Sequence, residues 1–131
     1  MIVVDTNVMV RFVVGGRHGA DATRLFLRDP EWAAPVILMS ELTNVLLGFV
    51  RRSSMTLDQA KAMCDDAATV LGPRVLSVSA DRVMDVALEC GLTAYDAEFV
   101  VVARELGARL ATGDRAMLRG AGDVAMGRGG W

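Results

Sequence analysis

Short runs of branched apolar residues alternate along this chain with longer segments in which apolar residues recur at helical spacing. This alternation is typical of an α/β domain, because a strand that is followed by a crossover helix returns to pair in parallel with a neighbouring strand. The expected strands are residues 2–4, 32–34, 74–78, 109–112 and 124–126. We therefore predict a mainly parallel sheet of four or five strands, flanked by helices in a three-layer domain.

Capping residues mark the expected helix boundaries. Thr56 and Gln59 have the spacing of a capping box, which predicts a helix beginning at this point. Ser79 is a side chain of the kind that caps the first turn of a helix, and Thr93 with Asp96 three residues on has the spacing of a second capping box. Pro35 is expected in the first turn of the helix that follows the second strand, where its missing N–H has no cost.

The chain of 131 residues has the size of one domain. Its hydrophobic content of 53% is high, but charges interrupt every apolar stretch before the roughly 20 residues that a transmembrane helix needs. The segment Met1–Asp5 lacks the basic region of a signal peptide. We therefore expect a cytoplasmic protein without membrane attachment, with one domain over residues 1–126 and a mobile Gly-rich tail over residues 127–131.

Cysteine and histidine are too scarce to build a site. Cys64 and Cys90 are the only cysteines, and each lies in an apolar helical pattern, which predicts reduced, buried thiols. His18 is the only histidine and lies in a Gly-rich loop, where we expect it to be solvated. These counts exclude a histidine-based catalytic triad and a His-rich metal site.

Four acidic residues are expected to meet at one edge of the sheet. Asp5 directly follows the first strand, Asp114 lies two residues after the fourth, Asp96 is in the first turn of a helix, and Glu41 lies early in the helix after the second strand. In a right-handed parallel sheet, the carboxyl ends of strands and the N-terminal ends of helices share an edge. Each acid alone is explained by a cap, a turn or a solvated surface. Together they indicate a site for a hard cation, because clustered carboxylates repel one another.

The net charge of −2 argues against a strongly basic nucleic-acid binder. Setting aside the four clustered residues leaves 12 acids against 14 bases. All but one of these bases are arginines, whose planar guanidinium suits contact with phosphate. An ordinary solvated surface explains most of these arginines equally well.

Four blocks of sequence occur in a fixed order between residues 2 and 118. They are Val4-Asp5-Thr6-Asn7-Val8, then Ser40-Glu41-Leu42, then Tyr95-Asp96-Ala97 with Ala103–Gly107, and finally Leu110-Ala111-Thr112-Gly113-Asp114 with Leu118. This pattern resembles the PIN-domain family, and in particular the VapC toxins of VapBC toxin–antitoxin pairs. The sequence departs from the commonest form around Asp114, where Gly113 and Arg115 replace a further acid, so a fifth ligand is left open.

The resemblance implies a Mg²⁺-dependent endoribonuclease, with Mn²⁺ as a possible substitute, that hydrolyses RNA phosphodiester bonds and leaves a 5′-phosphate and a 3′-hydroxyl. It implies that Asp5 and Asp96 are direct metal ligands, and that Glu41 and Asp114 complete the site directly or through water. Hydroxyl and amide groups near these acids would orient the carboxylates. These orienting residues are Thr6, Asn7, Ser40 and Thr112.

The resemblance further implies a homodimer and a VapB-type antitoxin, through which alone the protein would contact operator DNA. The candidate surfaces are residues 42–50 and 57–71. An antitoxin would bury apolar side chains in a groove between them and place a basic residue at the acid cluster.

Two alternatives remain. A PIN module that binds RNA or protein without cleavage would share the fold. A phosphate-handling hydrolase of haloacid-dehalogenase or receiver type would also place an Asp after the first strand. The dehalogenase pattern requires an acid at Asn7, and the receiver pattern requires a late Lys, whereas Lys61 is the only lysine.

Overall fold

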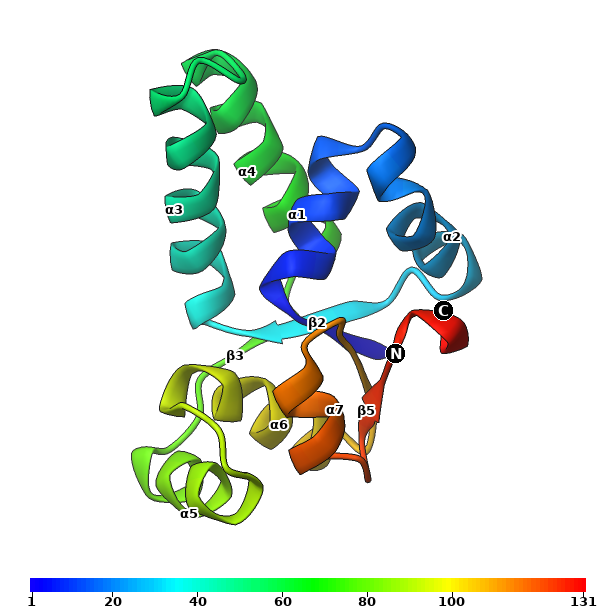
Figure 1. The fold of residues 1–131 in the computed structure, drawn as a ribbon, viewed down its shortest axis with the longest axis vertical. Coiled ribbons are helices and arrows are strands. Elements are labelled where there is room, and N and C mark those ends of the chain that lie inside the picture. Colours follow the sequence, from blue (N-terminus) through cyan, green and yellow to red (C-terminus); the bar gives the residue numbers. More distant parts are fainter.

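The computed structural model describes residues 1–131 as an α/β domain around a five-stranded sheet in the order β3-β2-β1-β4-β5 (Figure 1). Every neighbouring pair of strands is parallel. The strands are β1 (Ile2–Val4), β2 (Trp32–Pro35), β3 (Val75–Leu76), β4 (Arg109–Ala111) and β5 (Ala125–Met126). The predicted α/β class and mainly parallel sheet are therefore confirmed, although β3 is shorter than expected.

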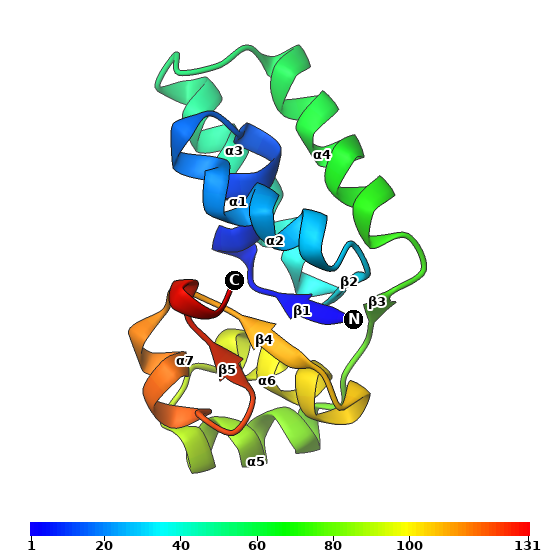
Figure 2. The ribbon, with the colours of Figure 1, turned by 90° about the vertical axis from the view of Figure 1, so that its right-hand side faces the viewer.

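Helices cover both faces of the sheet. They are α1 (Thr6–Val14), α2 (Ala20–Arg28), α3 (Ile37–Arg51), α4 (Leu57–Leu71), α5 (Ala80–Cys90), α6 (Ala94–Leu106) and α7 (Arg115–Gly120), with short 3-10 helices at Arg17–Gly19 and Arg128–Gly130. Helices α1 to α4 lie on one face and α5 to α7 on the other, and α3 and α4 form a hairpin that extends away from the sheet (Figure 2). None of the helices is both long and apolar enough to span a membrane.

The predicted helix caps are present, with one difference. Thr56 and Gln59 form both hydrogen bonds of the capping box, and the Ser79 hydroxyl accepts from the backbone N–H of Arg82. The Thr93 hydroxyl accepts from the backbone N–H of Asp96 at 3.1 Å, but the Asp96 carboxylate does not accept from the backbone N–H of Thr93, so the second capping box is incomplete.

Pro35 is the last residue of β2 and not the first turn of a helix, so that expectation was wrong. The neighbouring residues explain why a proline is tolerated there. The N–H groups of Ala34 and Val36 bond to Arg74 and Leu76 at the β3 side, each at 3.0 Å. Because alternate residues of a strand point their N–H groups to opposite sides, Pro35 loses no bond to β3.

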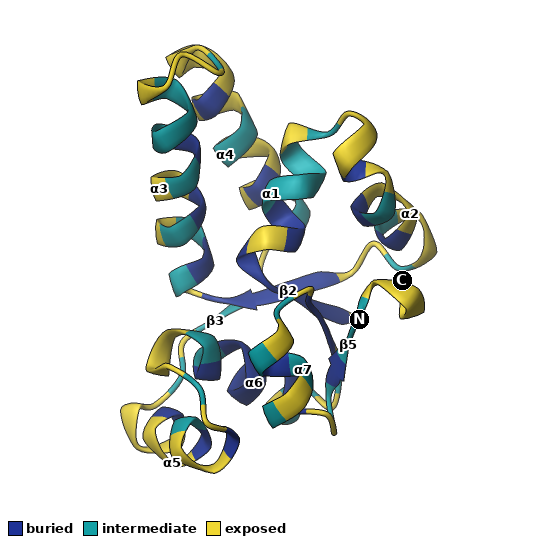
Figure 3. Cartoon of the chain, in the orientation of Figure 1, coloured by how far each residue is buried: buried dark blue, intermediate teal, exposed yellow.

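The strands form the centre of the core. All three residues of β1 are buried, as expected of a central parallel strand, and Figure 3 shows burial along β1, β2 and the sheet-facing sides of the helices. Phe12, Phe26 and Trp32 pack together between α1, α2 and the sheet, with ring centroids 4.8 to 5.4 Å apart. Cys90 is buried and Cys64 half-buried, whereas His18 is exposed.

The Gly-rich tail, for which the sequence predicts mobility, packs against the domain in this structure. Trp131 is only 5% exposed, and its indole N–H donates to the backbone oxygen of Met126 at 3.0 Å. Arg28 of α2 donates to the backbone oxygen of Gly130 at 3.0 Å. The chain end therefore lies beside α2, near the N-terminus (Figure 1).

Candidate metal centre

Four carboxylates from four different elements line one hollow of about 250 Å³, which we call the acidic pocket. Asp5 follows β1 and caps α1. Glu41 lies in the second turn of α3, Asp96 in the first turn of α6, and Asp114 caps α7 beyond β4. The four acids therefore lie together at the carboxyl edge of the sheet, as the sequence predicts.

Asp5 is the most deeply placed acid of the pocket, with 3% exposure. Its Oδ1 accepts from the backbone N–H of Val8 at 2.8 Å, and its Oδ2 accepts from the hydroxyl of Thr112. Burial raises the pKa of Asp5 to about 6, with a further contribution from the charges of Asp114 and Asp96, although the two hydrogen bonds oppose the rise. The fold therefore keeps this carboxylate where its ionised form is costly.

The other acids are half-buried and influence one another. Burial raises the pKa of Asp96, and the charges of Asp114 and Glu41 add to that rise, although a side-chain hydrogen bond with Thr93 opposes it. Asp114 Oδ1 accepts from the backbone N–H of Met117 at 2.9 Å, so its interpretation as a helix cap is correct, yet the residue also lines the pocket. Glu41 Oε1 accepts from the hydroxyl of Thr6 at 2.6 Å.

The residues expected to orient these carboxylates have different positions. Thr112 and Thr6 bond to Asp5 and Glu41 respectively. Asn7 lines the pocket with an exposed side chain. Ser40 is exposed and lies outside the acidic pocket, in a neighbouring hollow, because its position in α3 points it away from Glu41.

Sequence reasoning missed two polar residues near the site. Asn44 lines the acidic pocket one helical turn after Glu41, and that three-residue spacing is the signal that could have identified it. Glu98 lies on α6, where burial raises its pKa and the charge of Glu41 adds to the rise. No motif in the sequence singled out Glu98.

The donor set fits a hard divalent cation. The charged groups of the pocket are all carboxylates, and oxygen ligands are those that Mg²⁺ prefers. The raised pKa values of Asp5 and Asp96 reflect burial together with repulsion between like charges, and a bound cation relieves that repulsion. In this structure no three His, Cys, Asp or Glu side chains are grouped so that they could hold a metal ion together. Mg²⁺ keeps several of its waters, so it needs only a few protein carboxylates.

A model of the PIN domain matches residues 2–123. The chain belongs to the PIN-domain family. No curated protein sequence matches this PIN domain closely enough to count as a relative. The motifs at Asp5, Glu41, Asp96 and Asp114 all lie inside the matched segment.

Solved structures similar to this PIN domain include PAE2754 from Pyrobaculum aerophilum, with 25% identity, a TM-score of 0.71, and coverage of 89% of this chain and 76% of that one. A toxin–antitoxin complex from Klebsiella pneumoniae has 19% identity, a TM-score of 0.69 and 98% coverage of both chains. VapBC2 from Rickettsia felis, bound to a fragment of its promoter DNA, has 17% identity, a TM-score of 0.67, and coverage of 97% of this chain and 98% of that one. At these identities the last two likenesses concern the fold.

Proposed function

We propose that this PIN domain is a Mg²⁺-dependent endoribonuclease that serves in the cytoplasm as the toxin of a VapBC-type pair. The observation that carries the proposal is the convergence of Asp5, Glu41, Asp96 and Asp114 on one pocket. The pocket contains no His or Cys side chain that could act as a nucleophile, and hydrolysis at such a site uses water.

Asp5 and Asp96 would hold a Mg²⁺ ion, or Mn²⁺ in its place, and Glu41 and Asp114 would complete the site directly or through water. The ion would supply activation of a water and neutralisation of charge on the scissile phosphate. The Thr112 hydroxyl fixes Asp5 Oδ2, which leaves the carboxylate little freedom to rotate away. The products are a 5′-phosphate and a 3′-hydroxyl.

The experiment is cleavage of single-stranded RNA with Mg²⁺, with Mn²⁺ and with EDTA. We expect Asp5→Asn and Asp96→Asn each to abolish Mg²⁺-dependent cleavage, because the amide keeps the shape but loses the charge that holds the ion. Asp81→Asn is the matched control for Asp96→Asn, since Asp81 is an exposed acid in the first turn of α5. Absence of cleavage by the wild-type protein would favour the alternative, a PIN module that binds RNA or protein without cutting.

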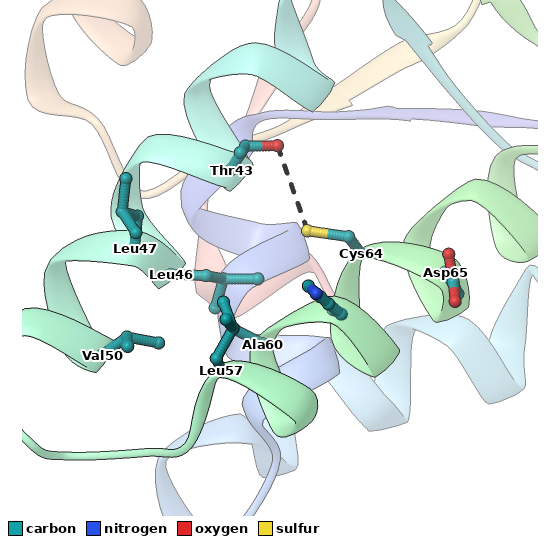
Figure 4. A pocket seen from close by; sticks show the side chains of 9 residues that line it. Thr43, Leu46, Leu47, Val50, Leu57, Ala60, Cys64 and Asp65 are labelled. Atoms are coloured by element: carbon teal, nitrogen blue, oxygen red, sulfur yellow. Dashed lines mark hydrogen bonds between the residues drawn. The ribbon is translucent and has the colours of Figure 1, made fainter.

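The antitoxin site in this proposal is the groove between α3 and α4. This groove has a volume of about 450 Å³, and Leu46, Leu47, Val50 and Leu57 give it an apolar lining (Figure 4). An amphipathic helix of a VapB-type antitoxin would bury its apolar face there, and a basic residue of the antitoxin would reach the acidic pocket. Contact with operator DNA would come only through that antitoxin.

The antitoxin proposal is tested by titrating the protein with the product of a neighbouring antitoxin-like gene in a calorimeter. We expect Leu57→Asp to weaken binding strongly, because Leu57 is half-exposed at the groove. Leu27→Asp is the matched control, since Leu27 lies on α2 with 79% exposure. Equal affinities of the two variants would place the antitoxin elsewhere.

The homodimer in this proposal is supported by exposed apolar side chains. Met84 and Leu88 lie one turn apart on α5 with exposures of 59% and 87%, which adds a candidate surface to residues 42–50 and 57–71. Sedimentation should show a dimer at micromolar concentration that Leu88→Asp weakens. A wild-type monomer throughout that range would contradict the dimer.

A further inference from the structure

A second hollow, of about 280 Å³, opens beside the acidic pocket. Asn7 lines both hollows, and Gly113, which precedes Asp114 in the chain, lines the second. Apart from Gly113 and its two chain neighbours, no residue has a heavy atom within 4 Å of the position that a Cβ of Gly113 would occupy, so space is open at this wall. Arg11 and Arg128 also line the second hollow, which we call the arginine pocket.

The arginine pocket carries an excess of positive side-chain charge. Arg11 donates to both carboxylate oxygens of Asp21, through Nε at 3.1 Å and Nη2 at 2.9 Å. Arg128 Nε lies 3.2 Å from Oδ2 of the same Asp21. One carboxylate therefore balances only one of two guanidinium groups. Nη1 of Arg11 and both terminal nitrogens of Arg128 donate to no acceptor in the protein and remain available to a ligand.

The tail holds Arg128 in place. Trp131 is 5% exposed and lines the arginine pocket, and Arg28 bonds to the backbone oxygen of Gly130 at 3.0 Å. Gly130 has no room for a side chain, because a Cβ would lie 2.6 Å from Cγ of Met126. These contacts fix the backbone that follows Arg128, while its side chain remains 57% exposed and its Nε is held by the ion pair with Asp21. A fixed backbone reduces the conformational freedom that is lost on binding a ligand.

We propose that the arginine pocket binds a backbone phosphate of the RNA that neighbours the scissile phosphate, and that Arg128 is a main contact. This proposal rests on the ribonuclease function proposed above. Guanidinium N–H groups match the geometry of phosphate oxygens. The acidic pocket repels an RNA backbone wherever no cation compensates it. The arginine pocket shares Asn7 with the acidic pocket. Its positive charge attracts the phosphate that lies next to the scissile phosphate along the RNA.

The test is the affinity for a single-stranded RNA oligonucleotide with a 5′-hydroxyl, so that every phosphate is a phosphodiester. Binding is measured by fluorescence anisotropy in EDTA, which prevents metal-dependent cleavage, over a range of KCl concentrations. We expect Arg128→Ala to raise Kd about tenfold, as loss of one charge-assisted contact does. The slope of log Kd against log salt should fall by about 0.7, the value for one single-strand phosphate contact.

Arg82→Ala is the control, because Arg82 is exposed on α5 on the opposite face of the sheet and makes only a 3.9 Å ion pair with Glu105. Arg128→Lys should recover part of the salt slope but less of the affinity, since Lys keeps the charge without the fork of donors. In Mg²⁺, Arg128→Ala should raise KM with kcat nearly unchanged.

Unchanged affinity and salt slope in Arg128→Ala would overturn the proposal while leaving the nuclease intact. Weaker antitoxin binding with unchanged RNA binding would assign the pocket to the partner and would also overturn it. If wild-type protein neither binds nor cleaves RNA, the proposed function itself fails, and that outcome is distinct because it needs no variant. Melting curves of each variant distinguish a folding defect from a binding defect.

Discussion

The hydroxyl of Thr112 donates a hydrogen bond to Oδ2 of Asp5, across 107 residues of sequence. The same hydroxyl accepts from the backbone N–H of Asp114 at 2.9 Å. One buried side chain thus joins the end of β1 to the start of α7 and sets the relative positions of two acids of the pocket. A branched side chain with a hydroxyl suits this position because Thr112 is fully buried and both of its polar functions are used.

Thr112→Val should therefore reduce stability and disturb the site together. Valine keeps the shape but leaves Asp5 Oδ2 and the Asp114 N–H without this partner, which costs about 1 to 3 kcal/mol. The pKa of Asp5 should rise further, because the lost hydrogen bond lowers it. Urea unfolding measures the stability, with Thr112→Ser as the control that retains the hydroxyl. If Ser and Val variants lose equal stability, packing of the methyl group and not the hydrogen bond is responsible.

The stability of the metal-free protein should fall between about pH 4 and about pH 6 because of Asp5. Burial raises the pKa of Asp5 from the ordinary value of 3.8 to about 6. Between these values the folded state holds a proton that the unfolded state has released, so the free energy of unfolding decreases as the pH rises. The expected loss from this group is about 3 kcal/mol by neutral pH.

Urea unfolding in EDTA at several pH values compares the wild-type protein with Asp5→Asn. Carboxylates outside the acidic pocket titrate equally in both proteins, so the difference between the two curves reports on Asp5 and on its coupling to Asp96 and Asp114. That difference should favour the Asn variant increasingly as the pH rises. A difference that is constant with pH would mean that Asp5 ionises in the folded protein as readily as in the unfolded chain.

Magnesium should stabilise the wild-type protein more than Asp96→Asn. An ion that binds only the folded state adds about 2.7 kcal/mol at a free concentration one hundred times Kd. In EDTA, Asp96→Asn should be at least as stable as wild type, because Asp114 and Glu41 repel the carboxylate that it removes. The substitution breaks no capping-box bond to the backbone of Thr93, although it weakens the side-chain hydrogen bond with Thr93 and loses the favourable charge near the start of α6.

The measurement is the melting temperature in EDTA and in excess Mg²⁺. Asp81→Asn controls for loss of a charge at a helix start, since Asp81 lies in the first turn of α5 and outside the acidic pocket. Its magnesium-induced rise should equal that of the wild-type protein. An equally large rise in Asp96→Asn would show that Asp96 is not part of the metal site.

Trp131→Ala should destabilise the domain, although Trp131 is the last residue of the sequence. Trp131 is 5% exposed, and truncation of a buried Trp costs about 3 kcal/mol or more. Leu27→Ala should change stability by less than about 0.5 kcal/mol, as is usual for an exposed surface position. Thermal unfolding of both variants decides the point, and a Trp131→Ala protein as stable as Leu27→Ala would mean that the tail is undocked in solution.

Much of this protein was predictable from local sequence. The buried strand at Ile2–Val4, the capping box at Thr56 and the helix beginning at Ser79 follow from periodicity and caps, because both depend on residues a few positions apart. The placement of Asp5 and Asp114 after strands also predicted a common edge, because parallel strands end on the same side. The position of Pro35 was predicted wrongly, because a strand accepts a proline only where its N–H group is not needed, and that depends on which side of β2 pairs with β3.

Contacts between remote parts of the chain decided the rest. The burial that raises the pKa of Asp5 comes from packing between several elements, and no motif encodes it. Trp131 is buried against the domain, and Arg11 and Arg128 both pair with Asp21. These contacts bring the first helices together with the chain end. Glycine-rich sequence carries no periodic signal, so only the folded domain offers the apolar surface and the carboxylate that fix the tail. The sequence thus predicted which acidic side chains come together, and the tertiary structure determined how deeply they lie and which arginines line the neighbouring pocket.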